Sequence, residues 1–207
     1  MLLGRWKLYF FLCLTLITQT ALSADLSQLL NSVTSMQANF TQTVYDNRGK
    51  AVQQSSGRMA FQRPGKFRWE VTKPIPQLII ANQTRLWIYD PDLAQVTIRS
   101  LQRAAGEAPA LLLSHAEGLQ QAFVVKASSS QANSQWFTLK PKKSDSFALI
   151  QMGFSNGRIN EMRLKDNLDH TTRIHFSTIR SNINLPSSLF TFKPPSNVDV
   201  IDETHQR

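Results

Sequence analysis

The hydrophobic residues of the chain follow a helical period at its start and the period of a strand afterwards. Between Asp25 and about Met36, apolar residues recur at the i, i+3, i+4 and i+7 positions of an amphipathic helix: Leu26, Leu29, Leu30 and Val33. Beyond this helix, apolar and polar residues alternate, which predicts strands with one buried face. The predicted strands cover residues 37–46, 54–63, 66–72, 77–81, 85–89, 94–99, 121–128, 135–140, 146–155, 158–165 and 170–180, then a strand near Phe190–Lys193 and a short one near Val198–Ile201.

The breaks between the predicted strands have the composition of tight turns. The segments DNRGK, RPGK, TKPIP, ANQT and YDPD carry the Gly, Pro, Asn and Asp residues that connect antiparallel neighbours. Asn156-Gly157 is a specific signal, because this pair favours the type I′ turn of a two-residue hairpin. The breaks recur about every eight to twelve residues, so we expect an antiparallel meander rather than strands connected by crossover helices.

Residues 105–116, AGEAPALLLSHA, interrupt the strands and predict a short helix that is apolar almost all round. Such a helix is too short to be stable alone, so it must cover another apolar surface. Two or three helical pieces are too few to form a layer over a sheet of about eleven strands. A sheet of this size usually curls to hide its apolar face. We therefore predict a mainly β (α+β) fold: an unclosed antiparallel β-barrel of about eleven strands, with a short helical lid over an apolar cavity.

The first residues predict a cleaved signal peptide, residues 1–23. Arg5 and Lys7 precede the apolar run LYFFLCLTLI, which is too short to span a bilayer. The following segment, QTALSAD, supplies the small residues that a signal peptidase reads. We expect cleavage after Ser23, with cleavage after Ala24 as the alternative.

The remaining chain, residues 24–207, is expected to form one soluble, unanchored domain. The only cysteine, Cys13, lies in the signal peptide behind bulky residues, so the mature protein would have no disulfide, no thiolate nucleophile and no lipid-attachment site. Loss of the two basic signal residues lowers the formal net charge from +9 to +7. A basic exported protein is expected to meet anionic membrane surfaces or acidic proteins. Clusters of basic and aromatic residues typical of nucleic-acid binding do not occur in the sequence.

Signals for catalysis or for metal binding are weak. The histidines lack the spacing of metal ligands: His115, His170, His175 and His205. The paired aspartates lie in predicted turns, where Asp usually caps the backbone: Asp90 and Asp92, and Asp166 and Asp169. The sequence contains neither a G-x-S-x-G elbow nor a glycine-rich phosphate loop. We therefore expect no catalytic residues, no metal site and no cofactor, although a triad assembled from distant residues is an alternative that the sequence leaves open.

Large apolar side chains share one predicted face of the strands. They are Met59, Phe61, Phe67, Trp69, Trp87, Met152 and Phe154. For any one of them a place in the core is the simpler interpretation. Two short helices can fill only part of a curled sheet, however, so together with Leu111, Leu112 and Leu113 of the predicted lid these residues are expected to line an apolar ligand cavity.

An arginine shares this apolar face. Arg63 lies two residues from Phe61 and four from Met59, so an extended chain points all three side chains the same way. A buried guanidinium has five N–H donors, each of which needs an acceptor. The carbonyl oxygens at the end of the lid helix are unpaired within that helix and carry the negative end of its dipole.

Five segments, in the same order over essentially the whole mature chain, resemble the LolA family of outer-membrane lipoprotein carrier proteins. They are MQANFTQTVYDNRGK, SGRMAFQRPGKFRWEVTKP, IIANQTRLWIYDPDLAQV, GEAPALLLS and FTFKPPSNVDV. The resemblance implies a monomeric periplasmic carrier, not an enzyme, with an unclosed barrel, a helical lid and an apolar cavity for acyl chains. It also implies that Arg63, at the arginine before proline of the family, gates the lid by hydrogen-bonding backbone carbonyls around Leu112 to Ser114.

The resemblance implies three partners. These are acylated lipoproteins as cargo, an inner-membrane ABC-type lipoprotein-releasing complex as donor, and a LolB-like outer-membrane lipoprotein receptor as acceptor. The receptor of the family is lipid-anchored through a cysteine, so the missing attachment site favours the carrier. Two other classes stay open on the residues alone: a periplasmic protein that binds lipids or other hydrophobic ligands without membrane partners, and an esterase-like enzyme.

Overall fold

The computed structural model describes residues 25–101, 109–114, 119–131, 134–143 and 147–204. The predicted signal peptide and both candidate cleavage positions lie outside the described residues. So do both ends of the predicted lid helix and two of the histidines, His115 and His205.

The strands in the described ranges form one sheet in the order β12-β6-β5-β4-β3-β2-β1-β11-β10-β9-β8-β7. Neighbours are antiparallel, with the exception of β12, which runs parallel to β6. The predicted meander is therefore confirmed. The strands are β1 Ser35–Tyr45, β2 Ala51–Gln62, β3 Lys66–Lys73, β4 Gln77–Ala81, β5 Arg85–Asp90, β6 Gln95–Ser100, β7 Phe123–Gln131, β8 Ser134–Pro141, β9 Phe147–Ser155, β10 Arg158–Asp166, β11 Thr171–Ser181 and β12 Asp199–Asp202.

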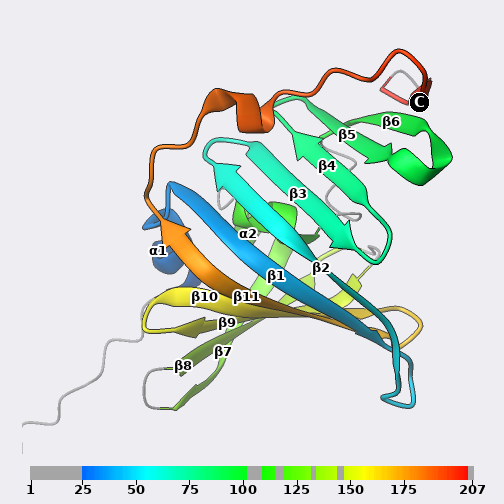
Figure 1. Ribbon diagram of the computed structural model, residues 1–207. Coiled ribbons are helices and arrows are strands. Elements are labelled where there is room, and N and C mark those ends of the chain that lie inside the picture. Colours follow the sequence, from blue (N-terminus) through cyan, green and yellow to red (C-terminus); the bar gives the residue numbers. More distant parts are fainter. Residues whose placement is uncertain (1–24, 102–108, 115–118, 132–133, 144–146, 205–207) are drawn as a thin grey trace, which may run out of the picture.

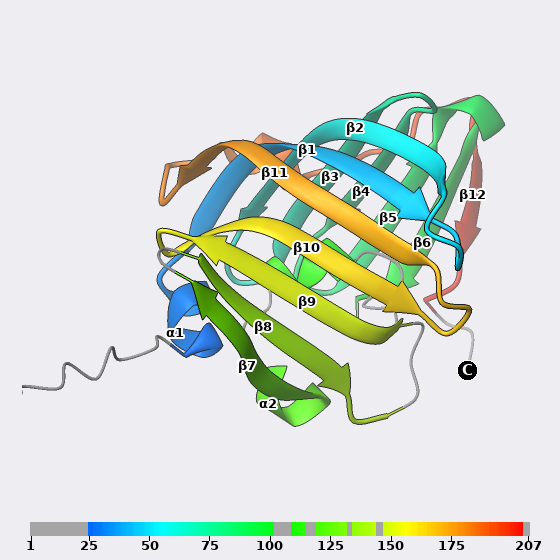
Figure 2. The same ribbon diagram turned by 90° about the horizontal axis from the view of Figure 1, so that it is seen from below.

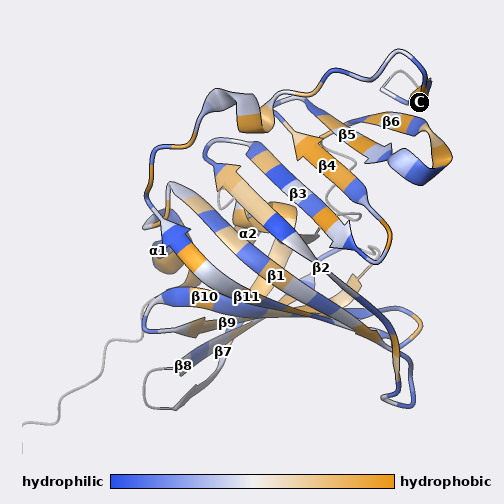
Figure 3. Cartoon of the chain, viewed as in Figure 1, coloured by the Kyte–Doolittle hydropathy of each residue, from blue (hydrophilic) through white to orange (hydrophobic). Residues whose placement is uncertain are grey.

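The sheet curls around a concave interior, as Figures 1 and 2 show. The paired strands β1 and β11 lie in the middle of the strand order, while β12 and β7 are its two edges. Since the two edges are not paired with each other, the barrel is unclosed, and the predicted mainly β fold class is confirmed. Figure 3 shows the alternation of apolar and polar residues along the strands that gives the sheet one apolar face.

The tightest predicted hairpin is also confirmed. Asn156 and Gly157 both have positive φ, 50° and 73°, and Ser155 pairs with Arg158 on either side of them. These values place both turn residues in the left-handed region that a type I′ turn requires. This turn fixes the register of β9 and β10.

Five short helices occur among the described residues: α1 Leu26–Asn31, η1 Pro91–Leu93, η3 Pro109–Leu113, α2 Leu119–Ala122 and η4 Ser187–Phe190. Helix α1 packs Leu26 and Leu30 into the core. The predicted helix extended to Met36, which was wrong, because β1 begins at Ser35 and Met36 pairs there with Phe61 of β2. Ladder hydrogen bonds and burial of Met36 outweigh the helical pattern at this point.

The segment between β11 and β12 crosses the outer face of the sheet. Phe190, at the end of η4, packs with Leu185 against Ala60 of β2, and Phe192 contacts the ring of Tyr89. The predicted strand at 190–193 is therefore wrong, since these apolar residues bind to a sheet face instead of extending a ladder. The predicted strand near 198–201 is present as β12.

The predicted strand at 121–128 begins later than expected. Leu119–Ala122 form α2, and β7 starts at Phe123. Leu119 and Phe123 both enter the core. Their spacing of four residues fits a helical turn that leads into the strand, which strand alternation alone does not reveal.

Candidate functional site

The concave side of the sheet contains most of the residues predicted to line a cavity. Eight of them are at most 6% exposed and belong to one core cluster: Met59, Phe61, Phe67, Trp69, Leu111, Leu113, Met152 and Phe154. Leu112 is half-buried and packs against the same cluster. In this structure these side chains therefore form a packed core beneath η3.

Trp87 is not placed with them, which corrects the predicted set. Its neighbours in β5, Leu86 and Ile88, are the residues that contact the core cluster. Successive side chains of a strand point to opposite faces, so Trp87 lies on the outer face. Its apolar character reflects packing on that face, where its pairing partners are Ile80 of β4 and Ile98 of β6.

Within the described residues, the lid segment, Pro109–Ser114, consists of the 3₁₀ helix η3 and the turn residue Ser114. Ser114 closes the turn, since both its backbone N–H and its Oγ donate to the carbonyl oxygen of Leu111, at 2.9 and 2.8 Å. Ala110, Leu111 and Leu113 are buried. The lid segment is thus held against the sheet mainly by its own apolar side chains.

Arg63 joins the end of β2 to this lid segment. Its Nη2 donates to the carbonyl oxygen of Leu113 at 2.7 Å, within the stretch where such a contact was expected. Its backbone N–H donates to the carbonyl oxygen of Thr34 at 2.8 Å, which anchors the residue beside the start of β1. The guanidinium carbon lies 5.6 Å from the centre of the Phe61 ring. The cation therefore sits between an apolar face and the carbonyl end of the 3₁₀ turn.

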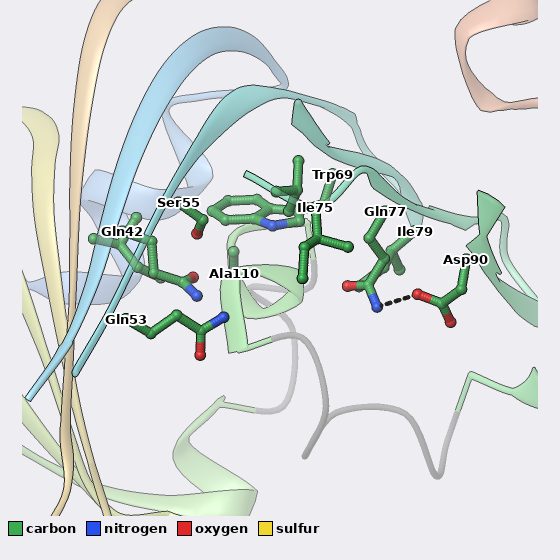
Figure 4. Close-up of a pocket in the computed structure, with 11 residues that line it drawn as sticks. Gln42, Gln53, Ser55, Trp69, Ile75, Gln77, Ile79, Asp90 and Ala110 are labelled. Atoms are coloured by element: carbon green, nitrogen blue, oxygen red, sulfur yellow. Dashed lines mark hydrogen bonds between the residues drawn. The ribbon is translucent and has the colours of Figure 1, made fainter. Parts of the chain in front are cut away.

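A pocket of about 270 Å³ opens beside the lid segment, between β1–β5 and β11 (Figure 4). One part of its wall is apolar, formed by Trp69, Val71, Ile75, Ile79, Ala110 and Ile174. The other part is polar, formed by Gln42, Gln53, Ser55, Gln77 and Asp90. The sequence reasoning identified Trp69 here and missed the polar group.

The polar group had a signal in the sequence. Gln42 follows Phe40 by two residues, and Ser55 and Gln53 continue the alternation that begins with Met59 in β2. Strand parity alone therefore points them to the interior. They were overlooked because only large apolar residues were counted on that face.

The arrangement suits the binding of apolar chains. Among the described residues, no three His, Cys, Asp or Glu side chains gather as a metal site would require. None of the described helices is long and apolar enough to cross a membrane. The site consists of a buried apolar face, the lid segment that covers it, and a polar wall beside the lid segment.

Comparison with known proteins shows which family the chain belongs to. The family model described as "Outer membrane lipoprotein carrier protein LolA" matches residues 31–193. The chain belongs to this family. The resemblance seen in the sequence is therefore confirmed.

Individual relatives agree with this assignment. The LolA-family chain is 39% identical to the outer-membrane lipoprotein carrier protein of Dechloromonas aromatica over 93% of each chain. It is 42% identical to the protein of the same description from Chromobacterium violaceum over 88% of each chain. An uncharacterized conserved protein from Thermus thermophilus shares the fold, with a TM-score of 0.56, 12% identity, and coverage of 84% of this chain and 97% of that one.

Proposed function

We propose that this protein shelters the acyl chains of its cargo against the concave apolar face of the sheet, after the lid segment has moved aside. As a member of the LolA family it is a periplasmic carrier of outer-membrane lipoproteins and not an enzyme. The observation that supports the mechanism is that the lid segment covers the apolar core cluster and accepts a hydrogen bond from the side chain of Arg63, directly after β2.

The packing of the lid segment supports the view that the structure is the closed state. Leu111 and Leu113 are buried in the core cluster, and the open space beside the lid segment is partly polar. The apolar surface that acyl chains need lies beneath Leu111 and Leu113. These two leucines occupy the place where acyl chains would lie, so loading requires their displacement.

The energies allow this exchange. An acyl chain of about sixteen carbons that leaves a membrane for water costs on the order of 12 kcal/mol, at roughly 0.8 kcal/mol per CH₂. Burial of two leucine side chains stabilises the closed lid by only about 3–6 kcal/mol. Acyl chains therefore displace the lid segment, and the energy of lid closure is subtracted from their binding.

We propose Arg63 as the gating residue. Its hydrogen bond to Leu113 stabilises the closed state and is lost when the lid segment moves. A carrier that recovered the full transfer energy of its cargo would not release it. The closure energy lowers the affinity enough for hand-over to a stronger acceptor to be downhill without ATP.

We further propose the route and the state of the carrier. The donor is an inner-membrane ABC-type lipoprotein-releasing complex and the acceptor is a LolB-like outer-membrane lipoprotein receptor. The carrier travels as a monomer, consisting of residues 24–207 after removal of the signal peptide 1–23. N-terminal sequencing of the exported protein tests the cleavage, with Ala24 or Asp25 as the expected first residue.

The deciding experiment is mass spectrometry of the intact protein purified from periplasm. We expect a co-purifying triacylated protein, bound in a one-to-one complex. Free lipids without any acylated protein would instead indicate a generic binding protein for lipids or other hydrophobic ligands. Capture of the inner-membrane complex by the tagged protein is a second test, because a generic binding protein needs no such partner.

A further inference from the structure

Inward-facing residues of β1, β2 and β4 change from apolar to polar toward the same end of the sheet, in two adjacent rows. Gln77 lies in the row of Phe40, since it pairs with Val71, Val71 pairs with Gly57 and Gly57 pairs with Phe40, and Gln42 lies in the next row. On β1 the step is from Phe40 to Gln42, and on β4 it is from Ile79 to Gln77. Gln42 pairs with Ser55 across β1 and β2. The polar residues therefore include two neighbouring pairs, Gln42 with Ser55 across β1 and β2, and Gln77 with Asp90 across β4 and β5.

On the other side of β1 the row of Gln42 stays apolar. Gln42 pairs with Ile174 of β11, Ile174 pairs with Met162 of β10, and Met162 pairs with Met152 of β9. These three partners are at most 2% exposed. The pocket thus lies where an apolar wall meets a wall of polar side chains. An acylated molecule has the same boundary, between its acyl chains and the polar groups that carry them.

The polar wall is neutral or acidic. Figure 4 shows the side chains of Gln42 and Gln53 beside each other, with Gln77 and Asp90 across the pocket. Gln77 Nε2 donates to Asp90 Oδ1 at 2.8 Å. Among the described residues that line the pocket, none is a lysine, arginine or histidine. The described part of the wall therefore offers amide hydrogen bonds and no cation.

We infer that this pocket binds the neutral polar junction of the cargo, the ester and amide groups where acyl chains join the peptide, and that it discriminates against the carboxylate of a free fatty acid. This inference rests on the proposed function. Amide N–H groups of Gln42 and Gln53 donate to ester carbonyls. Because Asp90 only accepts, it turns the NH₂ of Gln77 toward itself, which leaves the Gln77 oxygen to accept from an amide N–H.

A free fatty acid meets the opposite conditions. Its carboxylate finds no positive partner in this wall and lies near the formal negative charge of Asp90. Charge repulsion and loss of hydration both oppose binding. The carrier would thereby stay free of the fatty acids that otherwise compete for an apolar cavity.

The test compares two single-chain ligands, monopalmitoylglycerol and palmitate, by displacement of an environment-sensitive dye at pH 8. We expect the parent protein to bind the neutral glyceryl ester at least about tenfold more tightly than palmitate. Gln42→Leu should weaken binding of the ester about three- to tenfold, as expected for one neutral hydrogen bond. Asp90→Asn should strengthen binding of palmitate.

Gln54→Leu is the matched control, because Gln54 is exposed and its neighbour Gln53 faces the pocket. Equal binding of both ligands by the parent, or equal effects of Gln42→Leu and Gln54→Leu, would overturn the inference and leave the acyl-binding function standing. Failure of both ligands to displace the dye from the parent would overturn the proposed function and this inference together.

Discussion

At the end of β2, Arg63 ties the sheet to the lid segment through a hydrogen bond of 2.7 Å to Leu113. A hydrogen bond from a charged donor is worth about 1.5–3 kcal/mol. Arg63→Leu removes this contribution from the closed state and keeps apolar contact, so acyl compounds should bind about ten- to a hundredfold more tightly. Loading should survive, and transfer to the receptor should slow. Arg63→Lys should restore transfer only in part, because a lysine lacks the planar fork of the guanidinium.

The measurement is a two-step reconstitution, with release of lipoprotein from inner-membrane vesicles followed by transfer to the receptor. Arg58→Leu is the control for loss of charge, since Arg58 lies in β2, five residues before Arg63, is exposed and forms an ion pair with Glu70. If Arg63→Leu transfers cargo as fast as the parent and binds acyl compounds no more tightly, Arg63 is a structural arginine of the core and not a gate.

Two glycines of the sheet differ in what a methyl group would meet. At Gly57 an added Cβ would overlap the backbone oxygen of Glu70 and lie 2.9 Å from Phe40 Cζ, beneath the stack of Phe40 on Trp69. At Gly153 the nearest atoms belong to the ring of Trp136, at 2.8 Å, which is half-buried and can shift. Gly57→Ala should therefore lower the free energy of unfolding by about 1–3 kcal/mol, and Gly153→Ala by less.

Urea denaturation of the empty protein measures both variants, provided that the slope of the transition stays constant. A midpoint for Gly57→Ala equal to that of the parent would show that β2 and β3 separate easily enough to admit a side chain. That result would also weaken the case for a rigid apolar face at this position.

At the scale of elements, the leucines of the described lid segment differ in burial, so they should contribute unequally to its closure. Leu113 is 1% exposed, whereas Leu112 is half-buried. Leu113→Ala removes a buried side chain but keeps the carbonyl oxygen that accepts from Arg63, so it weakens closure through packing alone, by about 2–5 kcal/mol. Dye and acyl compounds should bind more tightly to Leu113→Ala than to the parent, and Leu112→Ala should have a smaller effect. Fluorescence titration measures the affinity of each variant for the dye and for acyl compounds. Weaker binding by Leu113→Ala would mean that Leu113 lines the loaded cavity.

The elements themselves were largely predictable, and the errors have physical causes. Alternation and turn chemistry identified β1–β6 and β8–β11, because each strand has one buried face and ends at Gly, Pro, Asn or Asp residues. Local pattern does not say which surface an apolar residue meets. Phe190 and Trp87 were therefore assigned to a strand ladder and to the interior, while the structure packs both on the outer face.

For the whole molecule, the sequence indicated a curled sheet but not its strand order. The pairing of β1 with β11 brings together strands from opposite ends of the chain, and no local signal carries it. The polar wall depends on this order, since Gln42 meets the apolar row only through Ile174 of β11. The contact of Arg63 with the lid segment was expected only through the family resemblance, because the two are 50 residues apart.

The same topology predicts which part of the molecule moves during loading. To open the barrel between β1 and β11, the ladder from Met36 to Tyr45 must separate, with loss of the hydrogen bonds that join about every second residue pair. To displace the lid segment, the bond between Arg63 and Leu113 and the burial of a few leucines must be given up. Loading should therefore leave the sheet intact and release residues 109–114.

Amide hydrogen exchange with and without a synthetic triacylated lipopeptide measures this directly. We expect fragments that cover the lid segment to exchange faster in the loaded protein, and fragments of β1 and β11 to remain protected. Empty Arg63→Leu protein should already show faster exchange in the lid segment, because its closed state is weaker. Protection lost along the edge strands β7 and β8, with residues 109–114 unchanged, would mean instead that cargo enters by spreading the sheet and that the lid segment is a fixed part of the core.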